Sequence, residues 1–323
     1  MKRVGIGICL VLVIVATADL FPGRAQETGA PVQQPAANPA ASNPLKVALL
    51  KWYKGNVTTS FTVGQQPYGV AFDGENIWTA NSGDGTVTKL RATDGAALGT
   101  FKVGNTPYGV TFDGANVWVS NSSDGSVTKL RASDGKTLGT FKVGQMPFWM
   151  VFDGEDVWVA NSGDGTVTKL RANDGKALGT FNTNGAIALA FDGTYIWVST
   201  YTDQVVRLKK DGTNAGSFKE GGRSIGIAFD GANVWVADAA GLTKLRARDG
   251  KTLGTFAIRG VSYAVAFDGT NIWVTSDTAV FELRPSDGAL LGIFGGGSGP
   301  TGIAFDGANL WVADGLGSSA YKI

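Results

Sequence analysis

Short runs of alternating apolar and polar residues recur along most of the chain, separated by glycine-containing polar breaks. In the first copy of this pattern, strand-like runs cover 69–72, 76–81, 87–91 and 98–103. Asp-Gly stands in the three breaks between them, and it is typical of tight hairpins because both central residues of a type I′ turn need positive φ. The pattern predicts four short antiparallel strands joined as a meander.

The tripeptide Phe-Asp-Gly marks the period of this pattern. It occurs seven times at spacings of 38 to 40 residues, with its phenylalanine at Phe72, Phe112, Phe152, Phe191, Phe229, Phe267 and Phe305. A period near 40 residues with several strands per unit is typical of a propeller blade, whereas a solenoid repeat of that length shows helical periodicity. We expect an all-β fold over residues 46–323: a seven-bladed β-propeller of four-stranded antiparallel blades.

One tryptophan follows each repeat phenylalanine by six residues. These are Trp78, Trp118, Trp158, Trp197, Trp235, Trp273 and Trp311. Large rings at one constant register are expected to pack between neighbouring blades rather than to contact a ligand.

The last repeat ends after its third strand, at residues 320–323, so one outer strand is missing from it. Upstream of the first repeat, residues 59–64 match the outer strand 99–104. We therefore expect a strand at about 57–63 to pair with the C-terminal blade and close the ring, which removes an exposed sheet edge. Residues 47–53 are also strand-like; they either cap the closing blade or compete with the C-terminal strand.

The N-terminus carries the features of an export signal. Lys2 and Arg3 precede an apolar run from Val4 to Ala18, which predicts a signal peptide within residues 1–25, cleaved after Ala18 or Ala25. An uncleaved anchor is the alternative. Residues 26–45 are rich in Pro, Ala and Gln and predict a disordered linker, or a tail that binds a wall or partner. We expect a periplasmic, secreted or surface protein with no membrane span in the mature chain.

Composition removes several kinds of chemistry. The chain has no histidine, and its one cysteine, Cys9, lies inside the signal segment, so the mature chain has no disulfide, thiolate ligand or cysteine nucleophile. The formal net charge is +1, which gives no electrostatic case for nucleic acid. Basic pairs on the third strands, such as Lys89 with Arg91 and Lys129 with Arg131, are interpreted as a solvated belt, with a polyanion-binding stripe as the alternative.

Two resemblances add to this reading. Residues 157–161 (Val-Trp-Val-Ala-Asn) followed by 166–170 (Thr-Val-Thr-Lys-Leu) resemble the bacterial propeller repeat named for Tyr-Val-Thr-Asn, found in YncE-like and surface-layer propellers. The resemblance covers residues 46–323 and implies an exported propeller. The chain is more distantly similar to streptogramin B lyases, whose family depends on histidine and magnesium; no histidine here matches that requirement.

The acidic residues are mostly explained by turns. Of 27, 22 are Asp, and nearly all stand at the three turn positions of a blade, where Asp bonds the local backbone. The acids outside the turns, notably Asp156, Glu220 and Glu282, lie on different blades. Loops 81–85, 121–125 and 161–165 have oxygen ligands that suit calcium but lack a dense acidic spacing. We expect no cofactor, with Ca²⁺ or Mg²⁺ as the alternative.

Propellers usually bind ligands at the mouth of the channel, where each outer strand leads into the next inner strand, so variation between repeats is most informative there. Trp149 stands where the first two blades have Gly69 and Gly109, and Arg223 replaces an uncharged residue. These changes predict a shallow site for a glycan, peptide or partner loop by stacking and one charge. Its residues are Tyr68, Tyr108, Phe148, Trp149, Arg223 and Tyr263. The alternative is a channel plugged by packed aromatic rings.

The sequence therefore predicts an exported, monomeric, non-enzymatic binding or scaffold propeller whose ligand or partner engages the channel mouth. The alternative is a metal-dependent lyase or lactonase-type propeller that uses carboxylates, which the absence of histidine disfavours.

Overall fold

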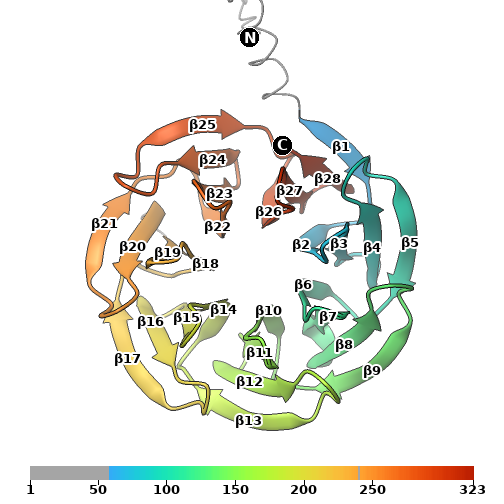
Figure 1. The fold of residues 1–323 in the computed structure, drawn as a ribbon, viewed down its shortest axis with the longest axis horizontal. Coiled ribbons are helices and arrows are strands. Elements are labelled where there is room, and N and C mark those ends of the chain that lie inside the picture. The colour runs from blue at the N-terminus through green and yellow to red at the C-terminus, as the bar shows by residue number, and fades with distance from the viewer. Residues whose placement is uncertain (1–57, 239–240) are drawn as a thin grey trace, which may run out of the picture. The chain divides into compact units, whose positions relative to one another are not determined.

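The computed structural model describes residues 58–238 and 241–323, which form seven four-stranded antiparallel sheets arranged as the blades of a ring (Figure 1). This confirms the predicted seven-bladed β-propeller. The first strand of every blade lies innermost and the fourth lies outermost, and consecutive strands are hydrogen-bonded neighbours.

The seven blades are built from 28 strands. Blade 1 consists of β2 (Pro67–Phe72), β3 (Asn76–Asn81), β4 (Thr86–Arg91) and β5 (Ala97–Lys102). Blade 2 consists of β6 (Pro107–Phe112), β7 (Asn116–Asn121), β8 (Ser126–Arg131) and β9 (Thr137–Lys142), with the short 3-10 helix Ser122–Asp124 between β7 and β8. Blade 3 consists of β10 (Pro147–Phe152), β11 (Asp156–Asn161), β12 (Thr166–Arg171) and β13 (Ala177–Asn182). Blade 4 consists of β14 (Ala186–Phe191), β15 (Ile196–Thr200), β16 (Gln204–Leu208) and β17 (Asn214–Lys219).

The remaining blades follow the same order. Blade 5 consists of β18 (Gly226–Phe229), β19 (Asn233–Asp238), β20 (Gly241–Arg246) and β21 (Thr252–Phe256). Blade 6 consists of β22 (Ser262–Phe267), β23 (Ile272–Ser276), β24 (Val280–Leu283) and β25 (Leu290–Phe294). Blade 7 consists of β26 (Pro300–Phe305), β27 (Leu310–Asp314), β28 (Ser319–Lys322) and, from the other end of the chain, β1 (Thr59–Thr62).

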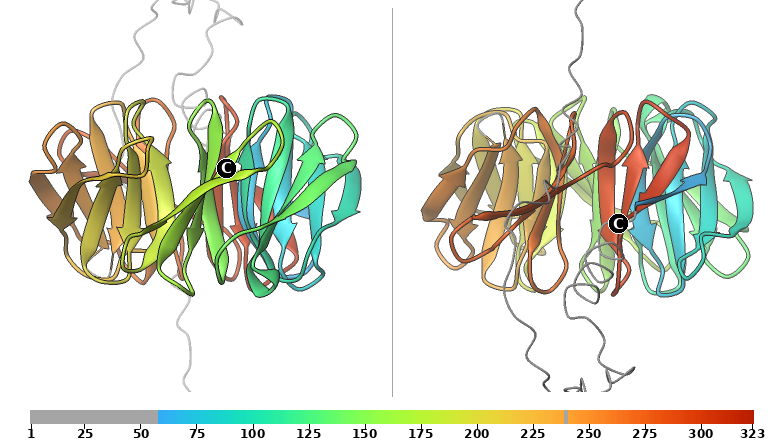
Figure 2. Two further views of the ribbon diagram at one scale, coloured as in Figure 1. Left: turned by 90° about the horizontal axis from the view of Figure 1, so that it is seen from below. Right: turned by 90° about the horizontal axis from the view of Figure 1, so that it is seen from above.

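Because every blade is an up-and-down meander, its turns lie at two opposite ends of the ring (Figure 2). We call the end at which the first strands begin the mouth face; it also carries the turns between second and third strands. The opposite end, the turn face, carries the Phe-Asp-Gly turns and the turns between third and fourth strands. Residues named below are placed by these two faces.

The ring is closed by β1, which pairs antiparallel with β28 from Thr59 opposite Lys322 to Thr62 opposite Ser319. Phe61 of β1 packs on Trp311, with ring centroids 5.2 Å apart. The predicted closure by a strand at about 57–63 is therefore confirmed. The predicted signal peptide, the linker and the strand-like segment 47–53 lie outside the described residues. Within 58–238 and 241–323, no helix has the length and apolar character to cross a bilayer.

The repeat tryptophans form the core between blades, as predicted. Six of them have no exposed surface, and Trp273 is 8% exposed. Each indole N–H donates to the aspartate of its own Phe-Asp-Gly turn at 2.7–3.0 Å. These aspartates therefore anchor the core rings in addition to shaping turns, a role that the sequence reading did not assign.

Lys89 and Lys129 on the third strands are buried, so the interpretation of a solvated basic belt is wrong for them. Lys89 is 7% exposed, lies opposite Trp78 in the sheet register and holds its ammonium 5.2 Å from that ring's centroid. Its Nζ donates to the carbonyl of Ala132 on the next blade at 2.7 Å. The neighbouring blade thus satisfies the charge that water was expected to solvate. Arg91, at the strand end, stays exposed and pairs with Asp94.

Candidate functional site

Three aromatic rings from successive blades stack on one another at the channel mouth. Each comes from the second residue of an innermost strand: Tyr68 on β2, Tyr108 on β6 and Phe148 on β10. The ring centroids of Tyr68 and Tyr108 are 4.7 Å apart, and those of Tyr108 and Phe148 are 4.4 Å apart. Trp149 meets Tyr108 edge-on, with centroids 5.5 Å apart and an interplanar angle of 80°. These side chains are all partly exposed.

Trp149 occupies a position that is reserved for small residues elsewhere in the ring. A Cβ added to Gly69 would collide with the carbonyl oxygen of Tyr108, and one added to Gly109 would collide with that of Phe148, because innermost strands approach closely at the mouth. In blade 3 the large Trp149 ring packs against an apolar cluster that includes Ala188. Its indole N–H is buried and has no hydrogen-bond partner among the described residues. The Trp149 ring therefore adds apolar surface beside the stacked rings, while its N–H is enclosed by the protein.

Tyr108 is the middle ring of the stack, between Tyr68 and Phe148. Burial raises the pKa of its hydroxyl, and the nearby Tyr68 and Tyr263 hydroxyls raise it further. Tyr263 comes from β22 on blade 6 and makes no ring contact with the stack among the described residues. The Tyr108 hydroxyl remains neutral over the physiological range and acts as a hydrogen-bonding group, never as a base.

The structure thus brings together four of the six predicted site residues in direct ring contact, with Tyr263 nearby. Arg223 is exposed on the loop between β17 and β18, and within the described residues it makes no cation–π contact with the rings. The rest of the mouth is lined by aliphatic residues, Ile187 and Ile225, and by Thr301. The rings in contact therefore form an aromatic arc across blades 1 to 3, and Arg223 supplies a charge at the rim.

The loop that carries Arg223 is fastened by a buried carboxyl that the sequence reading named only as an acid outside the turns. Glu220 is 8% exposed, lies within hydrogen-bond distance of the Ser224 hydroxyl, and leaves its second oxygen buried without a partner among the described residues. Ser224 Oγ also lies 3.0 Å from the carbonyl oxygen of Thr200. Since a hydroxyl has one proton, a protonated Glu220 can donate to Ser224 while Ser224 donates to Thr200.

Burial raises the pKa of the Glu220 carboxyl from 4.5 to about 8; the Ser224 hydrogen bond acts in the opposite direction, and Asp238 and Asp203 add to the increase. The folded state therefore holds this proton more tightly than the unfolded state. Its contribution to stability is complete below pH 4.5 and is lost as the pH rises toward 8.

We expect the free energy of unfolding to fall by about 2 kcal/mol between pH 5 and pH 8 through this group, because local opening of the loop limits the cost. Glu220→Gln, which cannot ionise, removes that part of the pH dependence and is more stable than the wild type at pH 8. Urea denaturation at several pH values measures both curves. Parallel curves for the two proteins would contradict a buried protonated Glu220.

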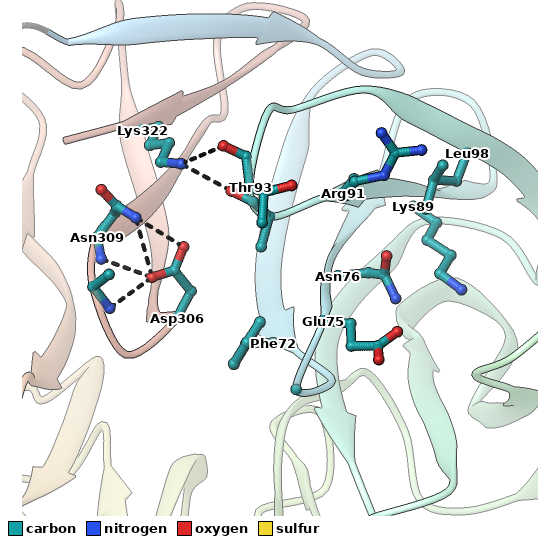
Figure 3. Close-up of a pocket in the computed structure, with 13 residues that line it drawn as sticks. Phe72, Glu75, Asn76, Lys89, Arg91, Thr93, Leu98, Asp306, Asn309 and Lys322 are labelled. Carbon is teal, nitrogen blue, oxygen red and sulfur yellow. Dashed lines mark hydrogen bonds between the residues drawn. The ribbon is translucent and has the colours of Figure 1, made fainter.

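A cavity of about 750 Å³ lies on the turn face between blades 7 and 1 (Figure 3). Several of its polar groups are engaged by the fold. Lys322 donates to the carbonyls of Ala92 and Thr93 at 2.8 and 3.2 Å (Figure 3). Asp306 accepts the indole N–H of Trp311 at 2.8 Å. The same bonds, from tryptophan to aspartate and from lysine to the carbonyls of the next blade, recur in other blades. The cavity is a gap between blades whose polar lining serves the fold.

The loops considered for calcium use their carboxylates locally. Asp84, Asp124 and Asp164 each accept a backbone N–H from the preceding loop, at 2.6, 2.7 and 2.9 Å. Across 58–238 and 241–323, no group of three or more Asp or Glu side chains is placed to hold a metal ion. The acids outside the turns stay apart as well: Asp156 pairs with Lys169 at 2.9 Å, and Glu282 accepts from Asn271 at 2.7 Å on another blade.

Comparison with known proteins supports the architecture. No family model and no curated protein matches the sequence. Among solved structures, the chain resembles hydrazine synthase of Kuenenia stuttgartiensis at a TM-score of 0.72 and 17% identity, covering 81% of this chain and 96% of that one. It also resembles a catalytically inactive histidine-to-alanine variant of virginiamycin B lyase from Staphylococcus aureus with quinupristin (TM-score 0.71, 16% identity, 82% and 98% covered).

A streptogramin B lyase structure matches similarly, at a TM-score of 0.71 and 16% identity, with 82% of this chain and 96% of that one covered. Identities this low indicate a shared fold alone. The expected distant similarity to streptogramin B lyase propellers thus holds at the level of the fold.

Proposed function

We propose that the chain is an exported, non-enzymatic binding propeller of the YVTN-repeat type that holds a glycan or peptide at the aromatic arc of its channel mouth. The observation that carries this proposal is Trp149. It stands where neighbouring blades have glycine, meets the three-ring stack edge-on, and has a buried indole N–H that no described residue accepts.

The arc suits ligands that combine flat or ring-shaped apolar faces with hydrogen-bond acceptors. Aromatic rings contribute large contact area at low entropic cost, and the tyrosine hydroxyls at the mouth can hydrogen-bond a sugar hydroxyl or peptide carbonyl. Arg223 at the rim favours a ligand that also bears a carboxylate. A muropeptide, which contains sugars, a short peptide and carboxylates, is therefore the first probe.

Export is supported by Lys2 and Arg3 ahead of the apolar run 4–18, and a non-enzymatic role by the absence of histidine. Among the solved structures that share the fold, a histidine-to-alanine variant of virginiamycin B lyase is catalytically inactive, and this chain has no histidine with which to perform equivalent chemistry. No observation among the described residues favours a metal-dependent lyase or lactonase.

The test is a titration of the protein with a disaccharide-tetrapeptide muropeptide, followed by tryptophan fluorescence and calorimetry. We expect saturable binding in the wild type and a loss of at least about tenfold in affinity in Trp149→Gly, which restores the residue of blades 1 and 2. Leu138→Ala, an exposed change on an outer strand, serves as control and keeps full affinity.

Thermal shifts extend the same experiment to the alternatives. A ligand present at a hundred times its Kd stabilises the folded protein by about 2.7 kcal/mol. Ca²⁺, Mg²⁺ and EDTA are expected to leave the midpoint of thermal unfolding unchanged. Separate titrations with the disaccharide and with the tetrapeptide identify which half is recognised. Equal binding by the wild type and Trp149→Gly would overturn the proposed site, and turnover of the probe in the presence of a metal ion would overturn the non-enzymatic role.

A further inference from the structure

One contact recurs at six junctions between blades, and its seventh instance is missing from the described residues. The phenylalanine of each outer strand lies over a glycine in the next blade's turn between third and fourth strands; Phe61 over Gly95 is one example. An added Cβ at any of these glycines would collide with the ring, and each has a positive φ of 70–86°. They are Gly95, Gly135, Gly175, Gly212, Gly250 and Gly288.

The junction of blades 6 and 7 departs from this pattern. Phe294, the outer phenylalanine of blade 6, faces the position where blade 7 needs a turn between its third and fourth strands. In blade 7 those strands are β28 and β1, which belong to opposite ends of the chain. A cavity of about 260 Å³ lies there, lined by Trp273, Glu282, Phe294 and Ile323 among others. Trp273 is accordingly the one repeat tryptophan with exposed surface, at 8%.

The sequence just before β1 has the register of the missing turn. In the six described turns, the glycine stands six residues before the phenylalanine of its own blade, as Gly95 does before Phe101. Six residues before Phe61 is Gly55. The segment that leads into Thr58 therefore has a glycine at the position that six other blades place beneath a phenylalanine ring.

The charges on the two sides of this junction are the reverse of those at the other six junctions. At the other junctions the residue opposite the tryptophan is basic, as Lys89 is, and donates to carbonyls of the next turn. Opposite Trp273 the residue is Glu282, which is acidic. Conversely, the residue before the turn glycine is Asp in all six described turns, whereas Lys54 precedes Gly55. A reversal on both sides of one junction is typical of partners that contact each other.

We propose that residues 52–57 of this chain dock into the cavity between blades 6 and 7 as the seventh turn, with Gly55 beneath Phe294 and Lys54 beside Glu282. This assigns a place to a segment whose position the sequence left open between capping the closing blade and competing with β28. It is the capping arrangement, because β1 already pairs with β28.

The test uses the full chain and hydrogen exchange measured by mass spectrometry. Gly55→Val puts a β-branched side chain where positive φ and a ring leave no room, so we expect exchange in Leu310–Ile323 and around Trp273 to be about tenfold faster than in the wild type. Gly29→Val, the same change outside this register, leaves exchange unaltered. Identical exchange in the wild type and Gly55→Val would overturn the proposal.

A charge exchange and an added peptide provide the second line of the test. Lys54→Glu is expected to speed exchange at the same segments, and the double variant Lys54→Glu/Glu282→Lys to restore protection, because it recreates the charges of the other six junctions. A peptide of residues 50–57 should bind the Gly55→Val protein and restore its protection, whereas the same peptide with valine at its glycine should not. Protection that depends on protein concentration would instead indicate a second copy as the occupant and would overturn docking within one chain.

Discussion

Removal of residues 1–63 is expected to abolish cooperative folding of the ring. Without β1, the third strand of blade 7 loses its hydrogen-bonded neighbour, and Trp311 and Gly95 lose the ring of Phe61 that covers both. The gap between blades 7 and 1 then exposes apolar surface and a free sheet edge in every molecule. We expect the free energy of unfolding to fall by about 5 kcal/mol or more, which is comparable with the whole stability of a typical domain.

Circular dichroism and calorimetry of the shortened chain measure this loss. The control is removal of residues 1–45, which keeps β1 and the segment before it and is expected to unfold in one cooperative transition like the full chain. If the chain that begins at residue 64 melts cooperatively near the same temperature, closure by β1 does not carry the stability that its contacts indicate.

Asp113→Ala is the point substitution from which we expect the largest loss of stability, about 3 kcal/mol. The carboxylate accepts the indole N–H of Trp118 at 2.8 Å and the backbone N–H groups of Ala115 and Asn116 at 2.9 and 2.6 Å. Alanine leaves the donor of a fully buried tryptophan without an acceptor and frees the turn that positions it. Chemical denaturation of the variant measures the change.

The matched control is Asp134→Ala in the same blade. Asp134 also follows a strand and also bonds its own turn, through the N–H of Lys136, but it is exposed and its ion pair is with Arg131 on the surface. We expect a much smaller loss. Equal losses for the two aspartates would mean that turn geometry, and not the bond to tryptophan, explains the conserved placement of both within the repeat.

The blades could be predicted because their signals are local. Asp-Gly fixes a hairpin through the φ angles of two residues, and the spacing of Phe-Asp-Gly counts the hairpins directly. Closure of the ring could be predicted because the last repeat lacks its outer strand and residues 59–64, near the other end of the chain, match that strand. None of these inferences needs contacts between blades.

The contacts between blades could not be predicted from the sequence. Lys89 and Arg91 share a face of one strand, yet the lysine is buried and the arginine exposed, because only Lys89 lies opposite Trp78 and within reach of the next blade's carbonyls. A signal was present: the Phe-Asp-Gly aspartate stands five residues before every repeat tryptophan. A constant spacing between a buried donor and an acidic acceptor indicates a bond between them.

In the candidate site, too, the residues on strands could be placed from the sequence and the residue on a loop could not. Strand register was sufficient to gather Tyr68, Tyr108, Phe148 and Trp149, because each occupies a fixed position in an innermost strand. Arg223 belongs to a loop whose course depends on the buried pair of Glu220 and Ser224, so sequence register could not place its side chain among the rings.

The direction of β1 determines the face of the ring at which the described chain begins. Thr59 pairs with Lys322, whose ammonium binds the turn between the third and fourth strands of blade 1, so the chain joins the ring at the turn face. The aromatic arc opens at the opposite pole. An attachment made directly at Thr58 therefore holds the propeller by its turn face, and it leaves the mouth clear for a large ligand to approach.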